Sequence, residues 1–196
     1  MKNQRRISRP LEWVLENRMT VREITGGQIP SEYLDKLVWA AYGNTHNDGR
    51  TKMRTAPSAG ATYPVELYIV VERIVGLDNG IYRYSSKAEK PVLMRKGIFL
   101  SPIRKVSLDQ DFISLSNIAF IMVYNPQRII DRYGRDSRKY AILESGHIAQ
   151  NILLMATAFD LGGVPVGAFY QKRLGSILEI DENREVLYMI CVGTID

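Results

Sequence analysis

Two arginines and a threonine alternate with apolar residues near the start of the chain, in what we call the arginine segment (residues 18–22). Alternate side chains of an extended backbone share a face. Arg18, Thr20 and Arg22 would therefore point one way, and Met19 and Val21 the other. Two guanidinium groups and a hydroxyl suit a phosphate monoester, because arginine pairs phosphate oxygens bidentately. A solvated charged connector would show the same alternation, so both interpretations stay open.

Small residues between two prolines form a second candidate, the small-residue loop (residues 57–60), whose members are Pro57, Ser58, Ala59 and Gly60. Small side chains let a backbone approach a flat ring closely, and free N–H groups can bond its heteroatoms. Pro57 and Pro64 would stiffen the loop. An ordinary turn before a strand is the alternative.

A third candidate is the late glycine segment (residues 165–168), which comprises Pro165, Val166, Gly167 and Ala168. It follows a predicted long helix, which we expect Gly162 or Gly163 to cap. Its backbone N–H groups could meet a ring nitrogen or carbonyl, although a plain helix-to-strand turn would have a similar composition.

Polar residues of the long helix give a fourth pattern. Glu144, His147 and Asn151 share one helix face at spacings of three and seven, and a buried polar network is the favoured interpretation. Glu144 and His147 also have the E-x-x-H spacing of di-iron bundles, but that architecture needs a second copy of the motif. With two histidines in the chain, we predict no metal site.

Several enzyme classes lack their motifs here. The sequence has no G-x-x-x-x-G-K-[ST] loop, no G-x-G-x-x-G after a strand and no G-x-S-x-G elbow. The net charge of +5 suits a solvated surface or an anionic ligand, and no basic helix or zinc-finger spacing indicates nucleic acid. No run of apolar residues approaches the length that a membrane-spanning helix needs.

The composition is that of a folded globular protein, with 45% hydrophobic and 24% charged residues. A chain of 196 residues suits one domain, which we assign to residues 1–196. Cys191 lies in an apolar run and is expected to be buried rather than reactive. One cysteine and no secretory signal favour the cytoplasm.

The positioning elements follow from periodicity. Helices are predicted from near Pro10 to Asn17 or Arg18, from about Ser31 to Gly43, over 137–161 and near 171–179. Strands are predicted at 66–72, 80–84, 91–95, 118–124 and 185–193, with a short segment at 163–169 and a long loop at 44–64. Helices and strands are interspersed without regular alternation, which favours an α+β fold.

The three segments, in this order, resemble the nitroreductase family of FMN oxidoreductases over residues 11–193. The sequence is most similar to the SagB-type dehydrogenase branch, which includes the azoline oxidases of modified peptides. The likeness rests mainly on residues 54–64 and on one helical motif, Tyr140-x3-Glu144-x-Gly146-His147-x2-Gln150-Asn151-x-Leu153.

This resemblance implies a nitroreductase-like, mostly antiparallel sheet flanked by helices, with the long helix buried at a dimer interface. It implies a homodimer that holds FMN between its subunits and takes NAD(P)H as co-substrate. The arginine segment, Met19 included, would hold the FMN phosphate and the polar edge of the flavin. The small-residue loop would come from the second subunit, and the late glycine segment would lie beside flavin N5 and O4.

Two departures from the family pattern matter. Many nitroreductases carry a basic C-terminal tail that grips the phosphate, and this sequence has none. The charge would then fall to Arg18 and Arg22, with Arg132, Arg135 and Arg138 as further candidates. Ala61 stands where typical nitroreductases have Asn, which agrees better with the SagB-type branch.

The resemblance also singles out Lys139 and Tyr140, because azoline oxidases have a Lys-Tyr pair implicated in proton removal at this place. A solvated Lys139 and a packed Tyr140 are the alternative. The expected function is hydride transfer through flavin N5 from a nicotinamide donor to a small electrophile such as a nitroaromatic or a quinone, or SagB-type dehydrogenation. A protein that binds FMN without turnover is the other hypothesis.

Overall fold

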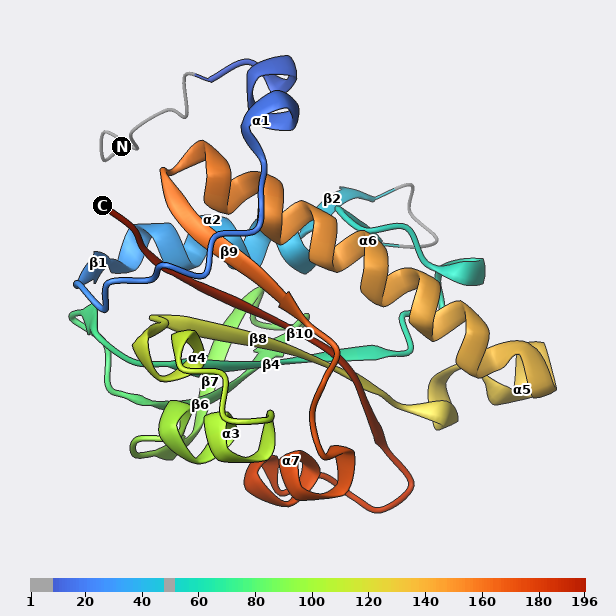
Figure 1. The fold of residues 1–196 in the computed structure, drawn as a ribbon. Helices are drawn as coiled ribbons and strands as arrows, with labels where there is room; N and C mark the ends of the chain where they lie inside the picture. Colours follow the sequence, from blue (N-terminus) through green and yellow to red (C-terminus); the bar gives the residue numbers. More distant parts are fainter. Residues whose placement is uncertain (1–8, 48–51) are drawn as a thin grey trace.

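The computed structural model describes residues 9–47 and 52–196. A six-stranded sheet with the order β7-β6-β4-β8-β10-β9 forms its centre, and every neighbouring pair is antiparallel (Figure 1). Its strands are β4 (Val65–Val71), β6 (Gly80–Ser85), β7 (Lys90–Lys96), β8 (Ile118–Tyr124), β9 (Leu161–Val166) and β10 (Glu185–Thr194).

The burial of each strand matches its position in the sheet. Every residue of β4 and β8 is buried, as their nearly continuous apolar sequences require of strands covered on both faces. The strand β7 alternates exposed and half-buried residues, which suits its place at the edge of the sheet.

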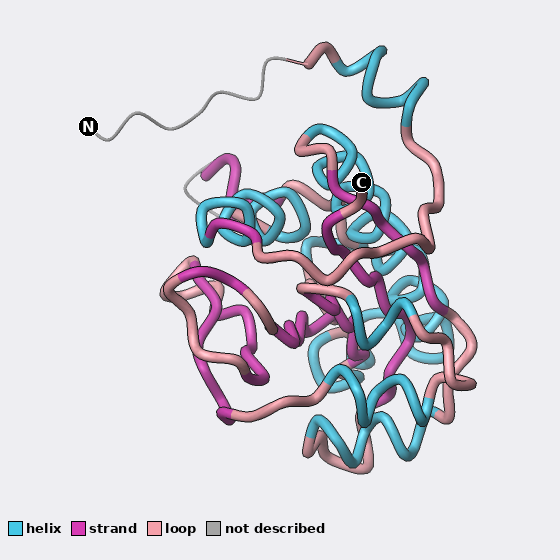
Figure 2. The backbone as a smooth tube through the Cα atoms, turned by 60° about the vertical axis from the view of Figure 1, so that its left-hand side comes forward, coloured by secondary structure: helices cyan, strands magenta, loops and turns pink. Residues whose placement is uncertain are grey.

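Helices cover both faces of the sheet (Figures 1 and 2). One core contains buried residues of α2 (Ser31–Tyr42) and α6 (Ser137–Ala158). The other contains those of α3 (Leu100–Val106), α4 (Phe112–Leu115) and α7 (Gln171–Leu178). The predicted α+β fold with a mostly antiparallel sheet and one long helix is therefore confirmed.

Shorter elements complete the fold. They are α1 (Leu11–Asn17), α5 (Ile130–Tyr133), the parallel pair β1 (Ile29–Pro30) and β5 (Ile74–Val75), the hairpin β2 (Asn44–Asn47) and β3 (Lys52–Arg54), and the 3-10 turns η1 (Ala59–Ala61), η2 (Pro126–Arg128) and η3 (Gly134–Asp136). The predicted structureless loop at 44–64 thus contains a hairpin and a turn, although residues 48–51 lie outside the described part. None of the helices within the described ranges has the length and hydropathy to cross a membrane.

The prediction that Gly162 or Gly163 caps the long helix is wrong. The helix ends at Ala158, and Asp160 makes the reversal with a φ of +57°. Both glycines are buried inside β9, where close packing demands them. A Cβ on Gly163 would lie 2.7 Å from Leu153 Cδ2 of α6, and one on Gly162 would lie 2.6 Å from Ile195 Cγ2.

Candidate active site

The arginine segment lies beside β9. Thr20 forms a parallel bridge with Gly163, and the Val21 backbone N–H donates to the Gly163 carbonyl at 3.4 Å. A Cβ on Gly162 would lie 3.4 Å from Val21 Cβ, so a larger residue there would crowd the segment. The structure therefore brings the arginine segment against the strand that leads into the late glycine segment, although the two are more than 140 residues apart in sequence.

The cations of the arginine segment are available to a ligand. Arg18 is half-buried and Arg22 is exposed, and neither forms an ion pair with any residue in the described ranges. Met19 is exposed, while Val21 is half-buried against Gly162. An anion at this place would meet two guanidinium groups that no described carboxylate neutralises.

The late glycine segment forms an open surface at the end of β9. Pro165 is half-buried and Val166 is buried, whereas Gly167 and Ala168 are exposed. A Cβ added to Gly167 would meet nothing within 4 Å. Bare backbone next to small side chains is the kind of surface on which a planar ring can rest.

The small-residue loop is attached to a different part of the molecule. Arg132 Nη1 donates to the Gly60 carbonyl at 2.8 Å, and Ser58 Oγ accepts from the Tyr63 N–H at 2.9 Å. Gly60 has a φ of +55°, and a Cβ there would lie 2.5 Å from Arg132 Nη1. Only glycine fits this position without strain, which explains the residue type.

A buried carboxylate holds the loop to α6. Glu144 accepts hydrogen bonds from the Tyr42 hydroxyl and from Ser58. Burial raises the pKa of Glu144, and these hydrogen bonds oppose the rise. Burial also raises the pKa of Tyr42 well above its ordinary value, with Glu144 as the next cause. The guanidinium of Arg54 lies 4.1 Å from the ring centroid of Tyr42.

Tyr42 and Arg54 were not predicted as part of the site. Tyr42 lies 102 residues from Glu144 in sequence, and no local pattern connects them. The predicted network of Glu144, His147 and Asn151 is wrong, because His147 faces solvent. Asn151 instead donates to the Thr55 carbonyl at 3.3 Å, so the long helix also contacts the chain just before the small-residue loop.

Lys139 and Tyr140 lie in the first turn of α6. Lys139 is exposed, and Tyr140 is half-buried with its ring centroid 4.8 Å from that of Tyr133. Their catalytic role stays a prediction. Of the further phosphate candidates, Arg138 pairs with Glu185 at 2.6 Å and Arg132 holds Gly60, whereas Arg135 is exposed.

Cys191 is fully buried, as expected, and burial raises the pKa of its thiol to about 12. It is therefore protonated and unreactive at neutral pH. Within the described ranges, no three His, Cys, Asp or Glu residues gather as metal ligands.

The sequence is similar to proteins of one known family. A model of the nitroreductase family matches residues 15–194. A protein of Methanocaldococcus jannaschii named as a nitroreductase is 38% identical over 172 residues, which cover 88% of this chain and 85% of that protein.

Two solved structures share the fold. One is a protein of Ralstonia eutropha described as a nitroreductase, with a TM-score of 0.82, 24% identity and coverage of 96% of this chain and 84% of the other. The second is a chain of the Escherichia coli microcin synthetase complex with a truncated precursor bound. It has a TM-score of 0.77, 18% identity and coverage of 93% of this chain and 72% of the other.

Proposed function

The chain belongs to the nitroreductase family of oxidoreductases, and on that premise we propose that it is an FMN-dependent enzyme. It would pass hydride between NADH or NADPH and a small electrophilic acceptor such as a quinone or a nitroaromatic. The observation that carries the proposal is the bridge between Thr20 and Gly163, which aligns two unpaired arginines with the strand that ends in an open backbone surface.

The residues present fit FMN. Arg18 and Arg22 supply positive charge for a phosphate, and Gly167 and Ala168 leave room for a flat ring. When bound, FMN supplies the hydride chemistry at its N5 atom. The chain's own contribution would be placement: the guanidinium groups and the Thr20 hydroxyl would hold the phosphate end, and backbone N–H groups of residues 166–168 would be donors for the polar edge of the ring.

A second copy of the chain would complete the site. The small-residue loop contacts Arg132, Tyr133 and Glu144, near α5 and the first half of α6, whereas β9 packs on Leu153 and Ala156 in the second half. The loop and β9 are thus attached to different halves of one helix. A homodimer supplies the loop from the partner to the flavin of this subunit.

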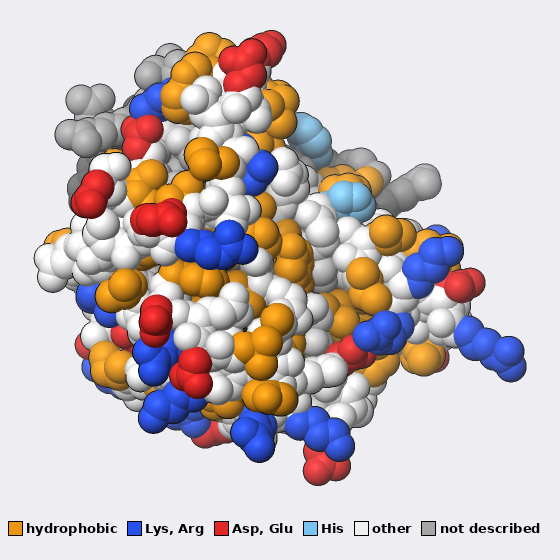
Figure 3. Space-filling model, in the orientation of Figure 1, with side chains coloured by type: hydrophobic (Ala, Val, Ile, Leu, Met, Phe, Trp, Pro, Cys, Tyr) orange, Lys and Arg blue, Asp and Glu red, His pale blue; other side chains and the backbone are white. Residues whose placement is uncertain are grey.

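Exposed apolar side chains support the dimer. Large ones lie on α6 and α1 and include Ile142 (44% exposed), Leu143 (52%), Leu11 (62%) and Leu15 (52%). Figure 3 shows hydrophobic side chains along the face that carries α6 and β9, with Lys and Arg along its lower rim. A monomer rarely leaves a large apolar surface in water, so this face suits an interface between copies.

SagB-type dehydrogenation is the second candidate. It is favoured by Lys139 and Tyr140 at the start of α6, where a lysine or phenol could accept a proton from a substrate. The fold of the microcin synthetase chain supports this reading at the level of architecture.

Purified protein tests the proposal directly. We expect a yellow preparation that releases FMN on denaturation and oxidises NADH or NADPH with a quinone or nitroaromatic acceptor. A colourless protein that takes up no added FMN would refute the cofactor assignment. FMN-loaded protein that turns over no donor would favour a binding protein instead.

A further inference from the structure

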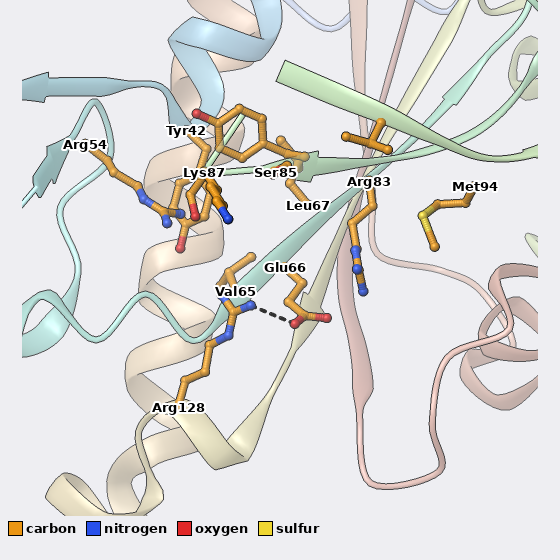
Figure 4. Close-up of a pocket in the computed structure, with 13 residues that line it drawn as sticks. Tyr42, Arg54, Val65, Glu66, Leu67, Arg83, Ser85, Lys87, Met94 and Arg128 are labelled. Atoms are coloured by element: carbon orange, nitrogen blue, oxygen red, sulfur yellow. Dashed lines mark hydrogen bonds and ion pairs between the residues drawn. The ribbon is translucent and has the colours of Figure 1, made fainter. Parts of the chain in front are cut away.

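The sheet opens into a pocket beside β4. This strand pairs with β8 from Val65 onward, but its pairing with β6 begins only at Tyr68, which is opposite Arg83. The edge of residues 65–67 that would face β6 therefore lines a cavity of about 380 Å³ instead of a strand (Figure 4). Neither the arginine segment nor the late glycine segment lines this cavity.

The pocket carries a strong excess of positive charge. Its lining includes the cations Arg54, Arg83, Lys87 and Arg128 and a single carboxylate, Glu66. Figure 4 shows these side chains around the pocket, coming from the end of β3, from β6, from the turn between β6 and β7 and from the η2 turn. Like charges held close together repel, so an anion bound among them would stabilise the fold.

Glu66 neutralises only Arg128 among these four cations. Its two oxygens are already bonded, Oε1 to Arg128 Nη2 and Oε2 to Arg184 Nη1, each at 2.8 Å. Arg83 and Lys87 form no ion pair with any residue in the part of the chain that the structure describes. Two cations thus face the pocket with no carboxylate partner.

Two further cations are held in place. The Arg54 guanidinium stacks over the rings of Tyr42 and Tyr63, at 4.1 and 4.2 Å from their centroids. Arg128 donates to the Tyr63 carbonyl at 3.2 Å as well as to Glu66. Guanidinium groups fixed in this way lose little freedom when they bind, which favours a planar or tetrahedral oxyanion.

We propose that this pocket binds a phosphate group, at a site separate from the arginine segment. The number of cations favours a multiply charged anion over a single carboxylate. Tyr63 connects the pocket to the small-residue loop, because its carbonyl accepts from Arg128 and its N–H donates to Ser58 Oγ. Its assignment to a substrate of the reaction, either the phosphate of a nicotinamide nucleotide or that of a phosphorylated acceptor, rests on the proposed function.

Titration with inorganic pyrophosphate tests the site, with the protein saturated with FMN so that the arginine segment is occupied. We expect the R83Q/K87Q variant to bind pyrophosphate roughly tenfold more weakly than the unmodified protein. The matched control, K105Q/K172Q, removes the same charge from exposed positions outside the pocket and should leave the affinity unchanged. Equal affinities in R83Q/K87Q and the unmodified protein would overturn the proposal.

Failure of the proposed function can be told apart from failure of this site. If the protein takes up no FMN, the same titration is run with R18Q/R22Q as an added variant. Pyrophosphate binding lost in R18Q/R22Q but kept in R83Q/K87Q would place the anion at the arginine segment and refute the pocket. Circular dichroism of each variant confirms that it is folded.

Kinetics then identify the source of the phosphate. If R83Q/K87Q raises the KM for NADPH but not for NADH, the pocket takes the 2′-phosphate of the donor. If pyrophosphate binding is lost while both KM values stay unchanged, the phosphate belongs to the acceptor.

Discussion

Arg18 and Arg22 owe their proposed role to what surrounds them. Both lie beside β9 without a described carboxylate partner, a setting in which a guanidinium gains most from binding an anion. Their alternation was visible in the sequence. The sequence did not show that Gly163 of β9 lies beside this segment, and that contact is what places the two arginines next to the late glycine segment.

We expect R18A/R22A to bind FMN at least roughly a hundredfold more weakly, because hydrogen bonds to charged groups contribute about 1.5–3 kcal/mol each. Fluorescence titration of the apoprotein with FMN measures this change. The control K105A/K172A removes equal charge elsewhere and should keep its affinity. Unchanged affinity in R18A/R22A would show that the phosphate binds at another place.

Glu144 gives a prediction about pH. Burial raises its pKa above the ordinary 4.5, so the folded state holds the proton more tightly than the unfolded state. Its contribution to stability is therefore greatest below pH 4.5 and declines as the pH rises through the raised value. The free energy of unfolding of the unmodified protein should fall relative to that of E144Q over this range.

Urea unfolding at fixed protein concentration and several pH values checks this prediction. Gln keeps an oxygen that accepts from the Tyr42 hydroxyl, so the variant isolates the charge. A difference in the free energy of unfolding between the two proteins that stays constant from pH 4 to pH 8 would contradict a raised pKa.

Nothing near Glu144 in sequence indicated its contact with Tyr42, because contacts between distant elements appear only in the folded chain.

At the scale of elements, periodicity predicted the strands well. The strand at Ile118–Tyr124 has the predicted bounds, and β10 differs from its prediction by one residue at its end. The helices α3 and α4, with seven and four residues, were not predicted, because so short a helix gives little periodic signal.

The misassigned glycines show a second limit of sequence patterns. Glycine after a helix is typical of a cap. Here positions 162 and 163 require glycine because α6 and the arginine segment pack directly against β9. Composition alone does not distinguish a left-handed turn from close packing between elements.

This packing can be tested at Gly163. We expect G163A to lower the free energy of unfolding by about 1–3 kcal/mol, because its Cβ would meet Leu153 in a filled core. It should also weaken FMN binding, because a shift of β9 would disturb its bridge to Thr20. The matched control is G167A, whose Cβ meets nothing and whose stability should change by less than about 0.5 kcal/mol. Equal stability losses in the two variants would argue against close packing at β9.

The whole molecule presents the arginine segment and the small-residue loop on different parts of one chain. The order of helices and strands predicted the α+β architecture and the family resemblance predicted its mostly antiparallel sheet, and the structure confirms both. The resemblance also predicted a flavin shared between two copies, which follows from no single residue because it depends on how two surfaces meet. The exposed apolar side chains of α1 and α6 form the surface through which the two copies would bind each other.

Complementation in a mixed dimer tests the shared site most directly. One chain carries R18A/R22A, and the other carries P57E, which places a charged side chain at the exposed start of the small-residue loop. Each homodimer should lack FMN. In the co-expressed heterodimer, one site combines the intact arginine segment of the second chain with the intact loop of the first. The account predicts one FMN per heterodimer, and a heterodimer that binds no FMN would contradict it.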